Sequence, residues 1–436
     1  MSIPPFRFIQ AGDFHLDRPP GGVADLPDHL KPTLVEAAYR AASRVFDLAL
    51  SERVDFMLLT GDLLHPPSAG PRGWFFLTEY FERLRQHGIG VFWGTGRDDA
   101  SLEWPALFPL PRNVERFDRE GVTRIVHERS STPIAEICGI GHGPQDMLRA
   151  ADFRPGHEGL FTIALAHGEI DAEVAAKHEK VDYWALGGEH QRRNLFTAPV
   201  TAHYAGSPQG RSPEESGPHG CTLVQVDELG QVETSFIPTD VVRYQTERVT
   251  GVDTASREAL EHLLAERATS LSGVGPDLLV TWIVVGRGAA VRQLRRGAIE
   301  AELLNRLRTD WGRRQPALWS LEVQAEPLGD VADSLFEEQS LRGEFLRLLQ
   351  QLDESSPSHL DMNPYLPERF LVGGVPQAVA VESLDQREKV LRDAALLGLD
   401  LLGGDDALGP ALPTDGRKQL AHGPAANGSS LSAWKD

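Results

Sequence analysis

Apolar and polar positions follow two different periods along the first part of the chain. Short apolar runs, typical of buried strands, are separated by stretches whose apolar residues recur every three or four positions, as on one face of a helix. The expected strands are Phe6–Gly12, Val54–Thr60, Ile89–Gly94, Leu160–Ala166 and Val181–Leu186, and the expected helices include 32–53 and Gly73–His87. Strands that alternate with helices pair in parallel through crossover connections. The pattern therefore predicts parallel pairing, with helices on the outside of the sheet.

The rhythm changes after Pro199, where shorter strands follow one another at 200–206, 220–226 and 231–237. Short strands without helices between them favour antiparallel or mixed pairing. Residues 1–245 are therefore predicted to form one α+β domain, a layered sandwich of sheets with helices on its outer faces.

The remaining residues divide into three parts. Residues 246–330 are predicted to form a small α+β unit, with helices at Ser256–Arg267 and Ala298–Trp311 and strands at 277–285 and 317–325. The region 331–402 contains the amphipathic segments Leu335–Leu352 and Ser383–Leu402, which are typical of helices that dock on another surface. Residues 403–436 are rich in Gly, Ala, Pro and Ser without periodicity, and they are predicted to form a disordered tail.

Composition and net charge exclude several classes of protein. The chain has 436 residues and a formal net charge of −20, so contact with nucleic acid would need local basic patches, a metal ion or a partner. No apolar run has the ~18 residues of a membrane helix, and the N-terminal segment lacks the pattern of a secretory signal. The two cysteines, Cys138 and Cys221, exclude a disulfide framework or a cysteine metal cluster. A cytoplasmic protein is therefore expected.

Side chains that bind metals follow the expected strands at the points where the strands end. Asp13 and His15 follow the first strand, Asp62 the second, His167 the fourth and His190 the fifth. The carboxyl ends of parallel strands lie along one edge of a sheet. Carboxylates and imidazoles collected there are costly without a cation, and together they suit manganese, iron or zinc. Each motif alone is weak, but the ordered set predicts a divalent metal site.

The ordered set resembles the calcineurin-like metallophosphoesterases. The motifs are D-x-H, G-D, the GRDD turn at 96–99, His167 and GGEH at 187–190. The segment Tyr204–Val226 (YAGSPQGRSPEESGPHGCTLVQV) resembles the DNA-repair exonuclease branch, the SbcD-type nuclease subunit that partners an SMC-like ATPase. The resemblance covers the first domain and implies a four-layer α/β/β/α sandwich. It also implies a small cap domain and C-terminal helices that grip the coiled coil of the partner ATPase.

The resemblance implies two metal sites that differ in how complete they are. Divalent manganese (Mn2+) is the expected ion. The ligands of the first site are all present: Asp13, His15, Asp62 and His190. The second site would share Asp62 and add His167, an asparagine and another histidine. Arg97 stands in place of the asparagine and Gly188 in place of the histidine, while Asp98 stands where the family has its catalytic histidine. The second site is therefore expected to be degenerate.

Three interpretations of the altered site remain open. Arg97 could supply a permanent cation in place of the second metal, so that Arg97, Asp98 and His167 serve the reaction. The second metal could instead be rebuilt with Asp98 or Glu189, which is less favoured because Arg97 would repel a nearby cation. Hydrolysis could also be lost altogether. Asp98 would assist a leaving group only if its pKa were raised, and beside Arg97 a lowered pKa is expected. Weak or absent activity is therefore expected.

The expected function is that of a metal-dependent phosphodiesterase, resembling the DNA exonucleases of double-strand-break repair. The alternative is a non-catalytic subunit that binds DNA ends or regulates an SMC-like ATPase, and a phosphodiesterase acting on a small nucleotide is a third possibility. The implied partners are DNA and the SMC-like ATPase, and a homodimer is also compatible. Six arginines are the candidate DNA contacts: Arg192, Arg193, Arg211, Arg292, Arg295 and Arg296. Arg211 could reach a phosphate, but an exposed loop residue is the favoured interpretation of this arginine.

Overall fold

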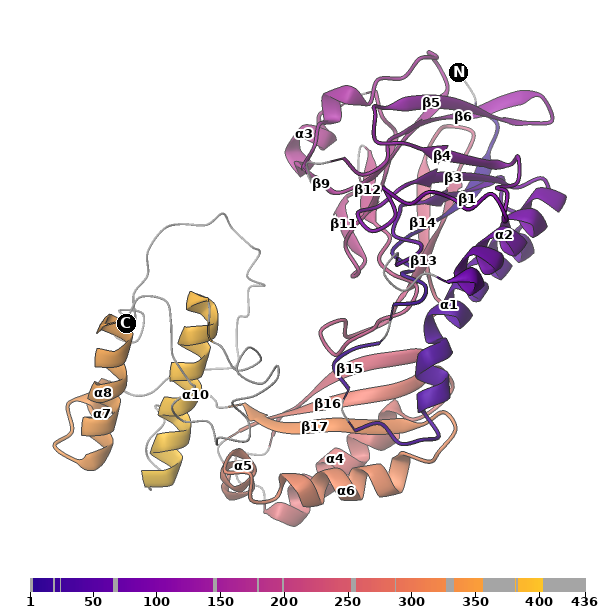
Figure 1. The fold of residues 1–436 in the computed structure, drawn as a ribbon. Helices are drawn as coiled ribbons and strands as arrows, with labels where there is room; N and C mark the ends of the chain where they lie inside the picture. The colour runs from indigo at the N-terminus through magenta and orange to yellow at the C-terminus, as the bar shows by residue number, and fades with distance from the viewer. Residues whose placement is uncertain are drawn as a thin grey trace. The chain divides into compact units, whose positions relative to one another are not determined.

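The computed structural model of the chain contains two compact units, which are described separately (Figure 1). The structure describes residues 3–402 except 19, 24, 66–69, 144–146, 179, 198–199, 252–255, 287, 327–332, 356–380 and 382. Unit 1 comprises Met1–Thr246, Ser272–Thr281 and Trp311–Leu321, and unit 2 comprises Glu247–Leu271, Trp282–Asp310 and Glu322–Asp436. The predicted tail, 403–436, lies outside the described residues.

The first sheet of unit 1 has six strands in the order β14-β13-β1-β2-β3-β4. Its strands are β1 (Phe6–Ala11), β2 (Phe56–Leu59), β3 (Gly90–Gly94), β4 (Val114–Phe117), β13 (Gly220–Val226) and β14 (Val232–Pro238). β1, β2, β3 and β4 pair in parallel, whereas β13 and β14 pair antiparallel with their neighbours. The parallel pairing predicted for the first three strands is confirmed.

The second sheet also has six strands, in the order β11-β12-β10-β8-β6-β5. Its strands are β5 (Thr123–Arg129), β6 (Thr132–Gly139), β8 (Phe161–His167), β10 (Tyr183–Gly187), β11 (Arg193–Phe196) and β12 (Thr201–Tyr204). The four inner strands are parallel, and β5 and β11 are antiparallel edges. The hairpin of β5 and β6 was not predicted, because the edge strand β5 contains no fully buried residue and so lacks a continuous apolar run. A short parallel pair, β7 (Met147–Leu148) and β9 (Glu169–Ile170), lies outside the two six-stranded sheets.

The two sheets pack face to face around an aromatic core. Phe8 stacks on Phe56 of the same sheet at a centroid distance of 5.0 Å, and its ring meets the edge of Tyr183 from the second sheet at 5.1 Å. The opposite side chains of β1, such as Ile9, pack in a separate cluster beneath the helices. Because side chains alternate along a strand, burial of both faces explains why these strands are almost continuously apolar.

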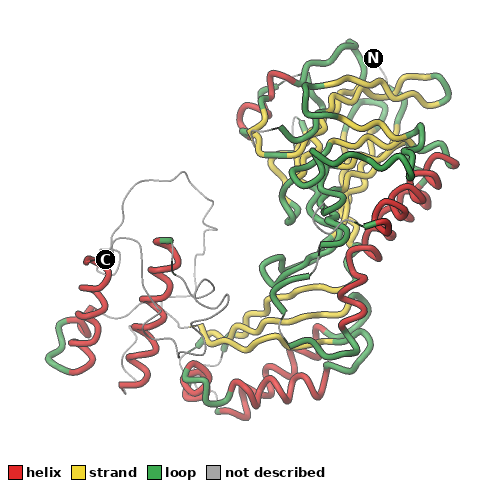
Figure 2. Tube along the Cα trace, viewed as in Figure 1, coloured by secondary structure: helices red, strands yellow, loops and turns green. Residues whose placement is uncertain are grey.

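Helices cover the outer faces of both sheets, which makes four layers. α1 (Lys31–Glu52) and α2 (Pro71–Gln86) lie beside the first sheet (Figures 1 and 2). Their apolar faces pack in one cluster with side chains of that sheet, including Trp93. Trp184 belongs to the cluster on the outer face of the second sheet, near the short helix α3 (Ala172–Ala176). The α/β/β/α sandwich expected from the resemblance is therefore confirmed.

A three-stranded sheet follows in the order β15-β16-β17. Its strands are β15 (Val242–Val249), β16 (Asp277–Val285) and β17 (Leu318–Glu326), and the helices in this part of the chain are α4 (Arg257–Leu271), α5 (Ala289–Arg295) and α6 (Glu300–Trp311). The mixed α+β content predicted here is confirmed, with boundaries that shift by a few residues. Helix α5, which carries two of the candidate arginines, was not predicted.

The C-terminal helical region differs from its prediction at one point. The segment predicted as one helix, Leu335–Leu352, forms two helices, α7 (Asp333–Phe336) and α8 (Leu341–Ser355). The hydroxyl of Ser340 accepts a hydrogen bond from the Gly343 amide, and the guanidinium of Arg347 donates to the Phe336 carbonyl oxygen at 2.6 Å. These contacts cap the two helix ends and stabilise the break. α10 (Leu384–Leu402) packs against α8. None of the described helices is long and apolar enough to cross a membrane.

Candidate metal centre

The loops after β1 and β2 run side by side and carry the predicted ligands. The amide of Asp13 donates to the Gly61 carbonyl oxygen at 2.8 Å, and the amide of His15 donates to the Asp62 carbonyl oxygen at 2.8 Å. The φ angles of Asp13, His15 and Asp62 are +52°, +44° and +51°. This left-handed conformation is uncommon outside glycine, and such residues cluster at functional sites. The strain is shared by three residues whose side chains meet at one place.

The GRDD turn after β3 is tied to the same loops. The buried carboxylate of Asp99 accepts hydrogen bonds from the amides of Leu63 (2.8 Å) and Gly96 (2.6 Å). Gly61 has a φ of +92°, and a Cβ at this position would lie 2.4 Å from the Gly96 nitrogen. Only glycine therefore allows the turn to approach β2 this closely. Burial and the negative charge of Asp62 raise the pKa of Asp99 to about 7.

Two histidines face each other at the centre of the site. Nε2 of His15 lies 3.1 Å from Nε2 of His190. The Nδ1 atom of His15 lies 3.1 Å from a carboxylate oxygen of Asp98, and Nδ1 of His190 lies 2.7 Å from a carboxylate oxygen of Glu215. An ionised carboxylate only accepts hydrogen bonds, so both Nδ1 atoms carry the proton and both Nε2 atoms present a lone pair. Two ligands of one metal ion lie about 3 to 3.5 Å apart, so this pair suits a shared cation.

Carboxylates complete the cluster. One carboxylate oxygen of Asp13 is buried and has no hydrogen-bond partner among the described residues; it lies 4.0 Å from Nε2 of His15. A carboxylate oxygen of Asp62 lies 4.0 Å from the same nitrogen and 3.5 Å from Nε2 of His167. His167 donates its Nδ1 proton to the Thr60 carbonyl oxygen at 2.9 Å, which leaves its Nε2 lone pair directed at Asp62. All five predicted ligands therefore converge.

The protonation states fit a divalent cation. Burial, together with the charge of Asp62, raises the pKa of Asp13. Burial lowers the pKa of His15 to about 4 and also lowers the pKa of His167. Neutral imidazoles and crowded carboxylates are the donors that manganese, iron or zinc accepts, and a cation relieves the repulsion between Asp13 and Asp62. The sets Asp13–His15–His190 and Asp13–Asp62–His167 each place one donor atom per residue within 4.8 Å of the others.

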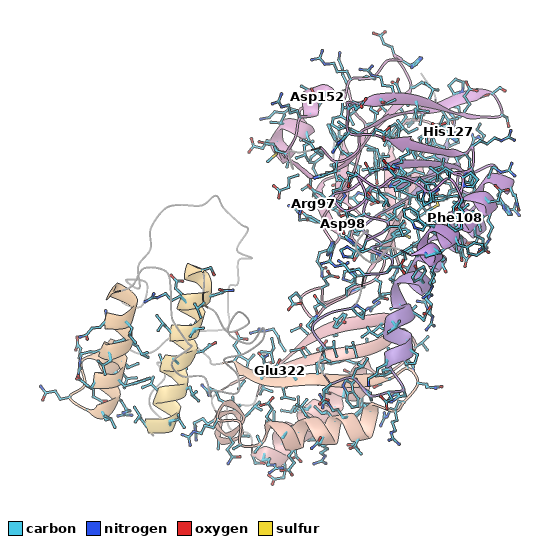
Figure 3. The ribbon with its side chains drawn as sticks, viewed as in Figure 1. Arg97, Asp98, Phe108, His127, Asp152 and Glu322 are labelled. Atoms are coloured by element: carbon cyan, nitrogen blue, oxygen red, sulfur yellow. The ribbon has the colours of Figure 1, made fainter. Side chains whose placement is uncertain are left out.

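Asp98 and Arg97 take different places from those predicted for catalytic residues (Figure 3). The carboxylate of Asp98 accepts hydrogen bonds from His15 at 3.1 Å and from His65 at 3.0 Å, which lowers the pKa of Asp98. Asp98 is therefore ionised and orients a ligand, rather than holding a proton for a leaving group. The lowered pKa was predicted, but its cause is hydrogen bonding with histidines and not the neighbouring Arg97. Arg97 is exposed, and its charge helps to lower the pKa of His167.

The residues around the expected second metal position differ from those that the resemblance implies. Gly188 donates its amide to Asp13 at 3.1 Å, and a Cβ at Gly188 would lie 3.1 Å from Nε2 of His167. A side chain here would reach the site, but glycine offers none. The carboxylate of Glu189, which was considered as a replacement ligand, instead forms an ion pair with Arg193.

Two important residues were missed or misplaced by the sequence analysis. Glu215 was not predicted, yet it orients His190. Arg211 was expected to be an exposed loop residue, but it is only 8% exposed. Its Nη2 atom lies 3.1 Å from Nδ1 and 3.4 Å from Nε2 of His190, and its Nε and Nη1 atoms have no hydrogen-bond partner among the described residues. The spacing R-x-x-x-E in the segment GRSPEE was the one available sign that these two residues act together.

Comparisons with known proteins agree with this site. The chain is 27% identical over 334 residues to the uncharacterized metallophosphoesterase YhaO of Bacillus subtilis (strain 168), which covers 73% of the chain and 81% of that relative. It is 22% identical over 207 residues to the DNA double-strand break repair protein Mre11 of Sulfolobus acidocaldarius, covering 43% of the chain and 54% of that relative. The chain is thus similar to metallophosphoesterases over most of its length. No family model matches it.

Solved structures show only a distant likeness to this chain. An archaeal phosphodiesterase covers 53% of the chain and 99% of its own length at 14% identity, with a TM-score of 0.27. A predicted phosphoesterase from Streptococcus pneumoniae TIGR4 covers 54% of the chain and 100% of its own length at 13% identity, with a TM-score of 0.24. The description of the site therefore depends on its own geometry.

The contacts of the other candidate arginines do not point to a ligand. Arg192 lies over the ring of Phe236 at 5.7 Å, and Arg193 is held by Glu189. Arg292 and Arg295 are half-buried on α5 in unit 2, and Arg296 follows at the C-terminal end of that helix. A role for these arginines in nucleic-acid binding stays a prediction.

Glu215→Gln is expected to weaken binding of a divalent ion about 10- to 100-fold, because it removes the charge that fixes the His190 tautomer. Burial alone would raise the pKa of Glu215, but the hydrogen bond with His190 and the charge of Arg211 hold it at about 2. Calorimetric titration with Mn2+ measures the effect. Glu214→Gln is the matched control, since Glu214 is exposed and adjacent. Equal affinities of the two variants would contradict a role for Glu215 in orienting the ligand.

Proposed function

We propose that the protein is a metal-dependent phosphodiesterase of the nuclease type that uses one divalent ion together with Arg211. The observation that carries the proposal is the burial of a guanidinium group beside His190, with two nitrogens that have no hydrogen-bond partner among the described residues. A buried arginine with unpaired donors is costly unless a ligand satisfies them. Its planar fork matches two oxygens of a phosphate group.

In this proposal Arg211, rather than Arg97, supplies the permanent positive charge that stands in place of the second metal ion. Arg97 is exposed at the GRDD turn, whereas Arg211 lies inside the cluster, where its charge also acts on Asp13 and His15. A divalent ion held by Asp13, Asp62 and the histidines would supply charge for activating water and neutralising phosphate oxygens. Arg211 would bind and orient the phosphodiester against that centre. The ion is best assigned as manganese, because the donors are carboxylate oxygens and imidazole nitrogens.

Slow turnover is part of the proposal. Asp98 occupies the place of the family's catalytic histidine, and its two hydrogen bonds with His15 and His65 keep it ionised. An ionised carboxylate has no proton to give to a leaving alkoxide. Substrates with good leaving groups, such as nitrophenyl phosphodiesters, would therefore be cleaved faster than DNA. Similarity to Mre11, a double-strand break repair protein, supports DNA as the natural substrate class.

Arg211→Met is expected to lower kcat/KM for bis(p-nitrophenyl) phosphate about 100-fold or more while Mn2+ binding is retained, because methionine keeps the buried stem but removes the phosphate donors. Hydrolysis and metal content are measured on the same preparations. Arg192→Met is the control, since Arg192 is a half-buried arginine that contacts Phe236 and Thr222 instead. Unchanged hydrolysis in the Arg211 variant would contradict the proposal.

A non-catalytic subunit that binds DNA ends or regulates an SMC-like ATPase is the second candidate. Exposed leucines on two helices of unit 2 support a docking role: Leu341, Leu348 and Leu352 on α8 and Leu397 and Leu401 on α10. Exposed apolar side chains gathered on neighbouring helices are typical of interaction surfaces. This candidate predicts metal and DNA binding by the wild-type protein without detectable hydrolysis of any phosphodiester, which separates it from the first proposal.

A further inference from the structure

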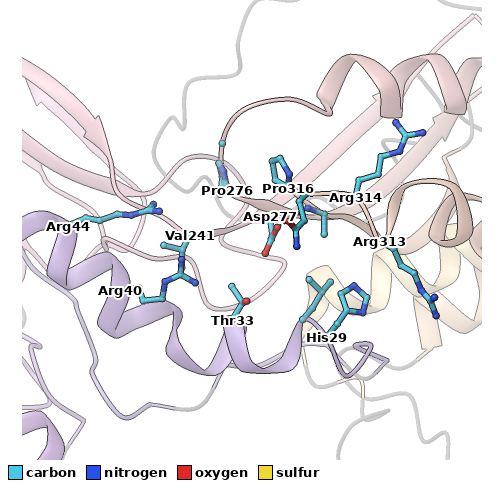
Figure 4. Close-up of a pocket in the computed structure, with 14 residues that line it drawn as sticks. His29, Thr33, Arg40, Arg44, Val241, Pro276, Asp277, Arg313, Arg314 and Pro316 are labelled. Atoms are coloured by element: carbon cyan, nitrogen blue, oxygen red, sulfur yellow. Dashed lines mark hydrogen bonds between the residues drawn. The ribbon is translucent and has the colours of Figure 1, made fainter.

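Unit 1 contains a basic pocket that shares no residue with the metal centre. It is an open pocket of about 440 Å³ between α1, the turn before β16 and the turn before β17 (Figure 4). Arg40 and Arg44 lie on α1, and Arg313 and Arg314 come from the segment that precedes β17. The pocket thus brings together two segments that lie far apart in the sequence, one on α1 and one before β17. Its volume is within the range of small-molecule sites.

Two of the pocket arginines, Arg44 and Arg314, make contacts that hold their guanidinium groups in place. Arg44 donates to the carbonyl oxygens of Thr239 at 3.1 Å and Asp240 at 2.7 Å. Burial and the nearby charge of Arg40 lower the pKa of Arg44. The guanidinium of Arg314 lies over the ring of Trp311 at 5.1 Å. A cluster of like charges that is anchored by backbone and aromatic contacts is arranged to receive an anion.

The carboxylates nearest to the pocket are already engaged. Glu36, one turn before Arg40 on α1, forms two hydrogen bonds with Arg72. The side chain of Asp240 is held by two hydrogen bonds from Arg243, at 2.6 Å and 2.9 Å. Asp277 is the one carboxylate among the residues that line the pocket, and its Oδ1 accepts the Ala317 amide at 2.8 Å. The lining of the pocket thus includes four arginines and one carboxylate, in a chain whose net charge is −20.

The rest of the lining is suited to an organic ligand rather than to a bare ion. Leu30, Val241 and Ala317 are buried apolar side chains of the wall, and Pro276 and Pro316 add rigid apolar surface. Thr33 and His29 add polar groups at the edge, and His29 is held by the Gly312 carbonyl oxygen at 2.9 Å. An apolar wall beside a cluster of guanidinium groups matches a nucleotide, with the base or sugar on the wall and the phosphates on the arginines.

We propose that this pocket binds the phosphate groups of a nucleotide, supplied either by a free nucleoside diphosphate or by the end of a nucleic-acid strand. The site is independent of the metal centre and of hydrolysis there. In either case the arginines bind phosphate oxygens through paired N–H donors, and the apolar wall contacts the nucleoside. Neither a free nucleotide nor a strand requires a divalent ion at this pocket, so binding persists in the presence of a chelator.

Binding to the full-length protein is measured in EDTA, which prevents any contribution from the metal centre. Isothermal titration uses ADP and inorganic pyrophosphate as small probes, and fluorescence anisotropy uses a short single-stranded DNA oligonucleotide. The pocket variant is Arg40→Ser with Arg313→Ser, because these two exposed arginines line the pocket from α1 and from the segment that precedes β17. The matched control is Arg119→Ser with Arg149→Ser, which removes the same charge from exposed positions of unit 1 outside the pocket.

The expected result is that the pocket variant binds ADP and pyrophosphate about tenfold or more weakly while the control binds like wild type. If only the oligonucleotide binds, and the pocket variant binds it more weakly than the control does, the phosphate belongs to a nucleic-acid strand. That result also supports the proposed site. The proposal is overturned if no probe binds wild type, or if the pocket variant binds as tightly as the control. Thermal unfolding of both variants verifies that they are folded.

Discussion

Replacing Asp62 with asparagine is expected to weaken binding of a divalent ion about 100-fold or more, and to abolish any hydrolysis that depends on it. Asp62 supplies a carboxylate oxygen to both His15 and His167, at 4.0 Å and 3.5 Å, so its charge serves the whole cluster. Its other oxygen accepts the Asp98 amide at 2.7 Å. Asparagine keeps that acceptor and the left-handed backbone, which Asn tolerates well, so the loop is expected to fold as before.

The measurement is metal content by mass spectrometry after dialysis against Mn2+, combined with hydrolysis of bis(p-nitrophenyl) phosphate. Asp118→Asn provides the control, because Asp118 is an exposed aspartate of unit 1 that belongs to none of the groups of possible ligands. Metal content of the Asp62 variant equal to that of the control would show that the five converging side chains do not hold an ion. That result would remove the basis of the proposed phosphodiesterase function as well.

Phe56→Ala is expected to lower the free energy of unfolding of unit 1 by about 3–5 kcal/mol, the second large effect. Phe56 is fully buried between the two sheets and contacts three phenylalanine rings, with centroids at 5.0 Å (Phe8), 5.8 Å (Phe6) and 5.7 Å (Phe92). Alanine leaves a cavity that rigid strands on both sides cannot close, so contacts are lost as well as buried apolar area.

Chemical denaturation monitored by fluorescence and circular dichroism gives the change in stability. Phe75→Ala is the matched control: Phe75 is 60% exposed on α2, so its truncation should change stability by about 0.5 kcal/mol or less. A loss in the Phe56 variant no larger than in the Phe75 variant would mean that the face-to-face packing of the two sheets contributes little.

The strands of the sandwich were predictable because a strand that is buried on both faces has an almost continuously apolar sequence. β1, β2, β3, β8 and β10 are almost entirely apolar, and each was expected within a few residues of its observed bounds. The edge hairpin of β5 and β6 was not predicted, since the side chains of β5 are partly exposed and mix polar with apolar types. The break between α7 and α8 was also missed, because it depends on Arg347 reaching back to carbonyl oxygens one helix earlier.

The ligand residues were predictable for a similar local reason. Asp13, His15, Asp62, His167 and His190 each follow a strand, and parallel strands bring their carboxyl ends to a common edge. By contrast, the hydrogen bonds from His15 to Asp98 and from His190 to Glu215 join loops that no local pattern connects. Asp98 was expected to bear on the reaction, whereas the structure shows it orienting a ligand.

The amino-acid sequence by itself determined the layered α/β sandwich and the residues at its metal-binding edge, since periodicity and strand-end position are properties of neighbouring residues. Tertiary structure alone decided the burial of Arg211 and the gathering of Arg40 with Arg313 around one pocket. The physical reason is that burial of a charged side chain and the meeting of distant segments depend on how loops pack over the sheets. Those contacts are long-range, and the periodicity of a segment carries no information about which distant residues will meet it.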